Sequence, residues 1–144
     1  MVLPAYVGRY EVRREIARGG FAVVVLAWDE ELDSPVALKI LDAVQNEDES
    51  LQRQFIEEAR LLRRIRSNHV VAVHDVGRLN DGRPYFVMDY ADRGTLADWL
   101  GQQNNRRDGG QSSPIPTRYL TAFVDAVADG LAAIHGSGIV HLSL

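Results

Sequence analysis

The chain has 144 residues, enough for one ordinary domain, and 46% of them are hydrophobic and 25% charged. A net charge of −4 gives no reason to expect nucleic acid or an anionic membrane as a partner. The absence of cysteine excludes disulfides and cysteine-ligated zinc, and the four scattered histidines indicate no metal site. No apolar run approaches the ~20 residues of a membrane span, and the N-terminal residues lack a signal-peptide pattern. A cytoplasmic protein is therefore expected.

The first third of the chain is predicted to form strands. Residues 1–9 are an N-terminal extension. Three apolar segments rich in β-branched residues follow, separated by a glycine turn and a polar turn. Because strands so close in sequence pair antiparallel, these segments predict three antiparallel strands: residues 10–16, 21–28 and 36–41.

A helix and two more strands are predicted next. After an acidic loop, residues 51–66 place Phe55, Glu58, Leu62 and Ile65 on one stripe, at helical spacings of three, four and three. Two strands follow with an Asp-Gly turn signal between them: residues 70–76 and 84–90. Five strands with one inserted helix make an α+β pattern rather than a repeating βαβ one.

The rest of the chain is predicted to be mainly helical. Thr95 to Asp98 have the pattern of a capping box, which begins a short helix through Leu100. Residues 101–116 are polar and rich in Asn, Arg and Gly, which predicts a flexible loop and the best domain boundary. Residues 117–135 then predict a long amphipathic helix. The organisation is thus a sheet-rich unit over 10–100 and a helical unit over 117–144.

Two charged residues stand where apolar ones are expected. Glu58 lies in the middle of the helical stripe, and Lys39 interrupts the apolar strand over residues 36–41. Each has an ordinary explanation alone: a glutamate at the edge of its stripe reaches water, and a lysine on a strand faces solvent or snorkels. Together they indicate a buried ion pair between strand and helix, because a buried charge is costly without a partner. Such a pair would hold the lysine head in place for an anionic ligand.

The turn between the first two strands has the composition of an anion-binding loop. Small residues let the backbone approach a ligand closely, and free N–H groups can face phosphate oxygens. The signal is weak alone, because a turn with two glycines is usually only a hairpin. The small residues are Ala17, Gly19, Gly20 and Ala22.

These features, in this order, resemble the eukaryotic-like Ser/Thr protein kinases, particularly their bacterial branch. The resemblance rests on the glycine turn, on Val36-Ala37-Leu38-Lys39, on Glu58 nineteen residues after Lys39, and on Gly138-Ile139-Val140-His141. It covers about residues 8–144. It implies a kinase-like N-lobe, with a five-stranded antiparallel sheet and one inserted helix, followed by a partial, mainly helical C-lobe.

The resemblance also implies an ATP site. In that family the glycine-rich loop covers the phosphates, and its pattern falls on residues 17–24. Ala17 and Ala22 stand where the family has glycine, so we expect weakened ATP binding. Lys39 is similar to the lysine that holds the α/β-phosphates, and Glu58 to its helix partner.

The adenine end of the site follows from the same resemblance. Val24 and Ala37 would lie on either side of the adenine ring, with Met88 as gatekeeper at the back of the pocket. Backbone groups of the hinge would hydrogen-bond the edge of the ring. The hinge residues would be Asp89, Tyr90 and Ala91.

The catalytic loop departs most from the family pattern. The family's H-R-D-L-x-x-x-N begins here as His141-Leu142-Ser143-Leu144. Ser143 replaces the aspartate that accepts the substrate proton, and loss of a general base typically costs ~10²–10⁴ in rate. The asparagine and the Asp-Phe-Gly that hold magnesium would come after Leu144. The chain alone is expected to transfer no phosphate. Magnesium is expected to bind only if residues after Leu144 supply its ligands.

Three functions remain open. The first is a truncated Ser/Thr kinase-like domain with an ATP-binding N-lobe, which Lys39 and Glu58 favour. The second is a pseudokinase that acts as a nucleotide-binding or protein-interaction module, which Ser143 and the altered glycine turn favour. The third is a remnant without function. In addition, the apolar face of the helix over residues 117–135 would be uncovered, which predicts a protein partner or self-association there.

Overall fold

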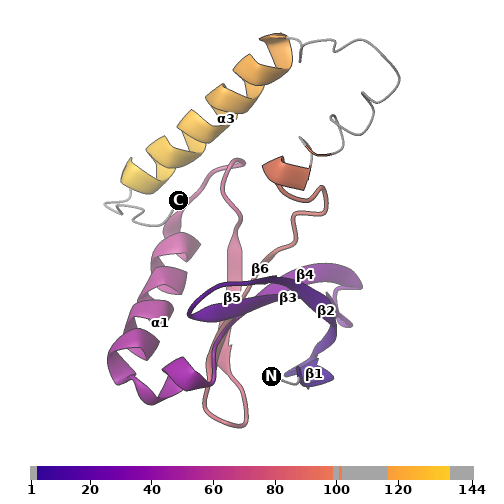
Figure 1. Cartoon of the computed structure of the whole chain (residues 1–144), viewed down its shortest axis with the longest axis vertical. Helices are drawn as coiled ribbons and strands as arrows, with labels where there is room; N and C mark the ends of the chain where they lie inside the picture. The colour runs from indigo at the N-terminus through magenta and orange to yellow at the C-terminus, as the bar shows by residue number, and fades with distance from the viewer. Residues whose placement is uncertain (1–2, 99–100, 102–116, 137–144) are drawn as a thin grey trace.

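A single antiparallel sheet forms the main body of the structure, a computed structural model that describes residues 3–98, 101 and 117–136 (Figure 1). The sheet has six strands in the order β1-β2-β3-β4-β6-β5, and each neighbouring pair is antiparallel. The strands are β1 (Tyr6–Val7), β2 (Tyr10–Arg18), β3 (Ala22–Asp29), β4 (Ser34–Leu41), β5 (Val73–Arg78) and β6 (Pro84–Asp89).

All five predicted strands are present, and β1 is a sixth that was not predicted. It comes from the N-terminal extension and pairs Tyr6 with Glu11 and Val7 with Tyr10. Gly8 makes the connecting turn at a φ of 58°, a conformation that glycine adopts without strain. A strand of two residues has no periodicity, so the sequence pattern could not reveal it.

The two faces of the sheet pack into separate cores. Alternate residues of β3 are buried, as expected for a strand with one face in a core. The first core lies on that face: Val7, Tyr10, Val23, Val25, Ala27, Val36, Leu38, Ile40, Tyr85 and Val87. The second lies on the opposite face, beneath the helix: Leu41, Phe55, Ala59, Val73 and Phe86.

Helix α1 (Glu49–Arg64) covers this second face (Figure 1). It follows a 3-10 turn, η1 (Val44–Glu47). Asp48 caps its N-terminus, since one carboxylate oxygen accepts the N–H groups of Ser50 at 2.8 Å and Leu51 at 3.2 Å. Phe55 packs its ring 5.1 Å from that of Phe86, which fixes the helix against β6.

Helix α3 (Thr117–Gly136) stands apart from the sheet (Figure 1). Gly130 is its buried residue, and a Cβ there would lie 3.1 Å from the carbonyl oxygen of His69. Its other apolar residues near the N-terminal end are exposed: Tyr119, Leu120, Phe123, Val124 and Val127. The predicted long helix and its uncovered face are thus confirmed.

The segment between the sheet and α3 is described only in part. The predicted capping box is present: Asp98 N–H donates to Thr95 Oγ1 at 3.1 Å, and Thr95 N–H donates to Asp98 Oδ2 at 2.8 Å. Apart from Gly101, the predicted loop over 101–116 lies outside the described residues. Among the helices that the structure describes, none is both long and apolar enough to cross a bilayer.

Asp29 joins the end of β3 to the turn between β1 and β2. Its side chain is 2% exposed, accepts the N–H groups of Glu31 and Leu32, and pairs with Arg9 at 2.9 Å. Burial alone would raise the pKa of Asp29, but the hydrogen bonds from Leu32, Arg9 and Glu31 outweigh it and hold that pKa below its ordinary value.

This network predicts a pH-dependent loss of stability in Asp29→Ala. Because the folded pKa of Asp29 is lowered, its stabilisation is fully present well above the unfolded value of about 3.9 and is lost as pH falls through the folded pKa. We expect a deficit of about 1–2 kcal/mol at neutral pH, the scale of a lost helix cap, which shrinks below pH ~4. Urea unfolding at several pH values measures it. Asp92→Ala, at an exposed position, is the control, and an equal deficit at every pH would contradict the assignment.

Candidate functional site

The strand register brings the predicted nucleotide residues onto one face of the sheet. Val24 lies opposite Lys39, and Ala37 lies opposite both Leu26 and Met88. Residues directly opposite in an antiparallel pair point to the same face, and positions two apart on one strand share it. Val24, Ala37, Lys39 and Met88 therefore lie together, on the face that α1 partly covers.

Lys39 reaches Glu58 across the space between β4 and α1. Lys39 Nζ lies 2.8 Å from Glu58 Oε1, so the partner predicted for each residue is correct. On the sheet side, the ammonium lies 5.5 Å from the centroid of the Phe86 ring and 5.9 Å from that of Phe55. The carboxylate and the two rings together fix where the lysine head lies.

The prediction that this ion pair is buried is wrong. The side chain of Lys39 is 27% exposed and that of Glu58 is 47% exposed. The buried line of α1 runs through Phe55 and Ala59, and Glu58 lies at its edge, so its carboxylate reaches water. A pair so exposed contributes only about 0–1 kcal/mol to stability, so its effect is mainly to position the two charges.

The glycine turn joins β2 and β3 as a hairpin, with a register shift between Glu15 and Ala17 close to the turn. Gly19 N–H donates to the carbonyl oxygen of Ala22 at 2.9 Å, and Ala17 pairs with Val24 one position from the pair nearest the turn. Neither Gly19 nor Gly20 has a positive φ, and a Cβ on Gly20 would meet no atom within 4 Å. The hairpin itself therefore does not require its glycines, and the space above Gly20 is open.

The predicted hinge is held by contacts that the sequence did not indicate. Asp89 exchanges hydrogen bonds with the backbone of Ala72, and its Oδ1 lies 2.6 Å from Nε2 of His74. Burial raises the pKa of Asp89, but the hydrogen bonds from Ala72 and His74 outweigh it and lower that pKa below its usual value. Arg14 of β2 donates to the Tyr90 hydroxyl at 3.2 Å. These partners are far apart in sequence, so no local pattern could have found them.

The remaining predicted site residues are distributed as follows. Ala91 is exposed directly after Tyr90, and Met88 is partly buried against the second core. Ser143 lies outside the described residues, as does the rest of the predicted catalytic loop. In the described ranges there is no group of three or more His, Asp or Glu side chains that could hold a metal ion.

The geometry predicts weak energetic coupling between Lys39 and Glu58. In a double-mutant cycle of Lys39→Met, Glu58→Gln and both together, we expect a coupling free energy below about 1 kcal/mol, because both side chains reach water. Denaturant unfolding of the four proteins measures it. A coupling near the 3–5 kcal/mol typical of breaking a buried pair would contradict the exposed geometry.

Comparisons with known proteins agree with this arrangement. The family described as Protein kinase domain matches residues 10–144. Serine/threonine-protein kinase PknL of Mycobacterium bovis is 39% identical over 134 residues, 92% of this chain and 31% of PknL. The probable serine/threonine-protein kinase pknA2 of Bifidobacterium longum is 33% identical over 137 residues, 93% of this chain and 17% of that protein. The chain thus spans about a third or less of these relatives.

A solved structure shows the same fold. The chain superposes on the crystal structure of the Mycobacterium tuberculosis PknI kinase domain with a TM-score of 0.72 and 25% identity, covering 100% of this chain and 56% of that one. The α+β kinase-like fold expected from the sequence is therefore confirmed, with six strands rather than five in the sheet. The family match extends over nearly the whole chain, and the chain belongs to the protein kinase domain family.

Proposed function

We propose that this chain binds ATP, as the nucleotide-binding part of a Ser/Thr protein kinase domain. The observation that carries the proposal is the contact of 2.8 Å between Lys39 and Glu58. In protein kinases such a pair must be in place for the lysine to hold the phosphates. An exposed ion pair does not by itself indicate a phosphate site. It supports one here because the chain belongs to the protein kinase domain family.

The proposed site has an apolar end and a charged end. Val24 and Ala37 lie on the face that would receive the adenine ring, and Met88 borders it beside Ala37. The phosphates would lie toward the Lys39 ammonium, which a carboxylate and two rings hold in place. A cation next to an apolar surface matches the two halves of a nucleotide.

The two rims of the site supply backbone groups. The hinge is proposed to hydrogen-bond the adenine edge through Asp89, Tyr90 and Ala91. At the other rim, the open space above Gly20 would allow the turn to lie over the phosphates. The turn residues assigned to this role are Ala17, Gly19, Gly20 and Ala22.

Phosphoryl transfer is not proposed for these 144 residues alone. Ser143, at the family's aspartate position, is neutral and a poor base. On the ground of this substitution, we propose nucleotide binding without transfer for these residues.

ATP-dependent thermal stabilisation tests the proposal. An ATP concentration roughly 100-fold above Kd should stabilise the folded chain by about 2.7 kcal/mol. We expect this shift in the wild type, with and without magnesium, and its loss in Lys39→Met. Arg93→Met, at an exposed arginine outside the site, is the matched control and should keep the shift.

Two outcomes would overturn this function. One is an unfolding temperature that ATP leaves unchanged up to millimolar concentration in the wild type. The other is full stabilisation in Lys39→Met, which would place the nucleotide elsewhere. A parallel assay with radiolabelled ATP should show no turnover. If turnover is seen and Lys39→Met abolishes it, the proposed site is correct and only the proposed absence of transfer is wrong.

A second candidate function is protein interaction, and the exposed face of α3 favours it. Large apolar side chains gather along one side of this helix, with Tyr119 54%, Phe123 45% and Val124 60% exposed. Contiguous apolar surface of this kind is uncommon on monomeric proteins. We propose that the 144-residue chain associates with a second copy of itself through this face.

Self-association predicts a mass that rises with protein concentration. Sedimentation velocity of the wild type should show dimers or larger species in the micromolar range, and Phe123→Gln with Val127→Gln should shift the protein toward monomer. Ala122→Gln with Ala132→Gln, at exposed positions elsewhere on α3, is the control. A monomeric wild type at all concentrations would contradict this candidate and leave the nucleotide site untouched.

A further inference from the structure

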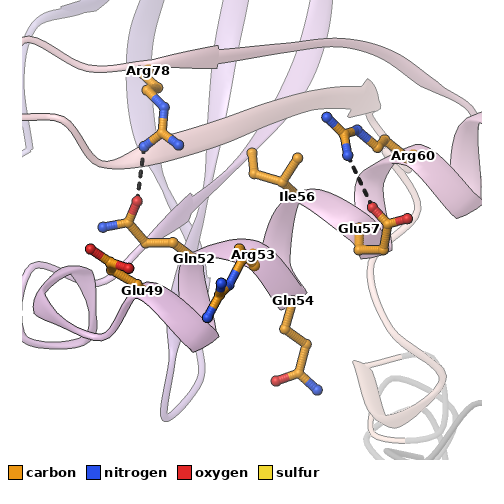
Figure 2. A pocket seen from close by; sticks show the side chains of 8 residues that line it. All are labelled: Glu49, Gln52, Arg53, Gln54, Ile56, Glu57, Arg60 and Arg78. Carbon is orange, nitrogen blue, oxygen red and sulfur yellow. Dashed lines mark hydrogen bonds and ion pairs between the residues drawn. The ribbon is translucent and has the colours of Figure 1, made fainter.

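Charge is distributed unevenly over this chain. A groove of about 860 Å³ lies along α1 beside Arg78 of β5 (Figure 2). A second hollow of about 480 Å³ lies at the C-terminal end of the helix. Both are lined by Arg60. We call the two together the arginine groove, after its six arginines: Arg53, Arg60, Arg63, Arg64, Arg66 and Arg78.

The groove opposes the charge of the rest of the chain. Its six arginines against Glu49 and Glu57 give a formal charge of +4, whereas the whole chain has −4, which leaves −8 on all other residues. None of the residues assigned to the nucleotide lines it. The groove is thus a separate surface, on the side of α1 turned away from the first core.

Most of its guanidinium groups are available to a ligand. Within the described part of the chain, the side chains of four arginines make no hydrogen bond or ion pair: Arg53, Arg63, Arg64 and Arg66. Arg60 makes an exposed pair with Glu57 at 3.2 Å.

One wall of the groove is pre-arranged. Arg78 donates to Gln52 Oε1 at 3.0 Å and to the Gly82 carbonyl at 2.8 Å, which fixes its guanidinium. Ile56 lies beside this wall and gives the groove an apolar patch (Figure 2).

Helix stability alone does not account for the arginines. Arg63 and Arg64 lie in the last turn of α1, where a cation interacts favourably with the helix dipole. Arg66 follows the C-cap Ile65, close to the same negative end, but Arg53 lies in the first half of the helix, where the dipole gives a cation no such benefit. Arg60 is three and four residues from Arg63 and Arg64, spacings at which like charges destabilise a helix. The cluster is therefore better explained by an external anion.

The length and composition of the groove indicate what kind of anion. Arg53 and Arg64 are eleven residues apart, or about 17 Å along the helix, a distance that about five residues of extended peptide cover. Guanidinium forks bind carboxylates through two parallel hydrogen bonds. Arginines spread over such a length match several carboxylates along a peptide better than they match one phosphate group.

A nucleic acid fits the groove less well than a peptide. Glu49 and Glu57 would face the continuous charge of a polynucleotide backbone, and no aromatic ring lines the groove for bases to stack on. We propose that the arginine groove binds an extended acidic segment of a partner protein, with Asp or Glu side chains on the arginines and an apolar side chain on Ile56.

The test uses the 144-residue chain and a fluorescein-labelled peptide of alternating Glu and Leu. Fluorescence anisotropy should show saturable binding that weakens as salt rises. Arg60→Glu with Arg64→Glu should weaken it by about tenfold or more. Arg93→Glu with Arg118→Glu has the same change in net charge at exposed positions outside the groove and should alter binding less than about twofold.

Three results would overturn the proposal. Equal losses of peptide affinity in the two double variants would show that the peptide is attracted by the net charge of the chain and not by a defined groove. A phosphoserine peptide or a single-stranded oligonucleotide that binds more than about tenfold tighter would assign the surface to another ligand. Amide chemical-shift changes in the wild type that miss residues 52–66 and 78 would also exclude it, whether or not the charge-reversed variant folds.

Discussion

The alternation of side chains along β4 is the constraint on which the rest of the site depends. Leu38 and Ile40 are almost fully buried in the first core, so Ala37, Lys39 and Leu41 must face the other way. A slip of one residue in register would move the lysine into that core and both aliphatic side chains out of it. Hydrophobic burial on one face thus determines where the cation lies on the other.

The position of Glu58 depends in turn on apolar packing of the helix. Phe55 and Ala59 are buried against Phe86 and the strands beneath, and the glutamate lies between them at the edge of this contact. Because the ion pair is exposed, it contributes little to the attachment of α1 to the sheet. The contact between Phe55 and Phe86 attaches the helix to the sheet. The ion pair forms because this packing places Glu58 near Lys39. A charge held in this way stays within reach of an anionic ligand in water.

Periodicity in the sequence was sufficient to predict most of the elements, though not β1, and one long-range contact. Five strands, α1 and α3 follow from alternation and helical spacing. The Lys39–Glu58 pair could be predicted because each charge interrupts an apolar pattern. Its exposure could not, because a stripe shows which side of a helix faces the core but not how far a residue at the edge of that side is covered.

Other contacts have no local sequence signal at all. Arg14 and Tyr90 meet across a separation of 76 residues, and Asp89 meets His74 through a pairing that exists only once the sheet has formed. The arginine groove also escaped prediction. Its arginines could be read from the sequence, but only the fold places Arg78 of β5 beside Gln52 of α1.

The contact between α3 and the rest of the chain leaves little room for a side chain at one position of the helix. At Gly130 the helix approaches the backbone of His69 so closely that any side chain would press on a carbonyl group, which has no rotamer to escape into. A substitution there would act as a wedge between α3 and the loop that precedes β5, without altering any residue of either proposed site. For a designer who wished to tilt the helix relative to the sheet, the size of this one residue would be the adjustable parameter.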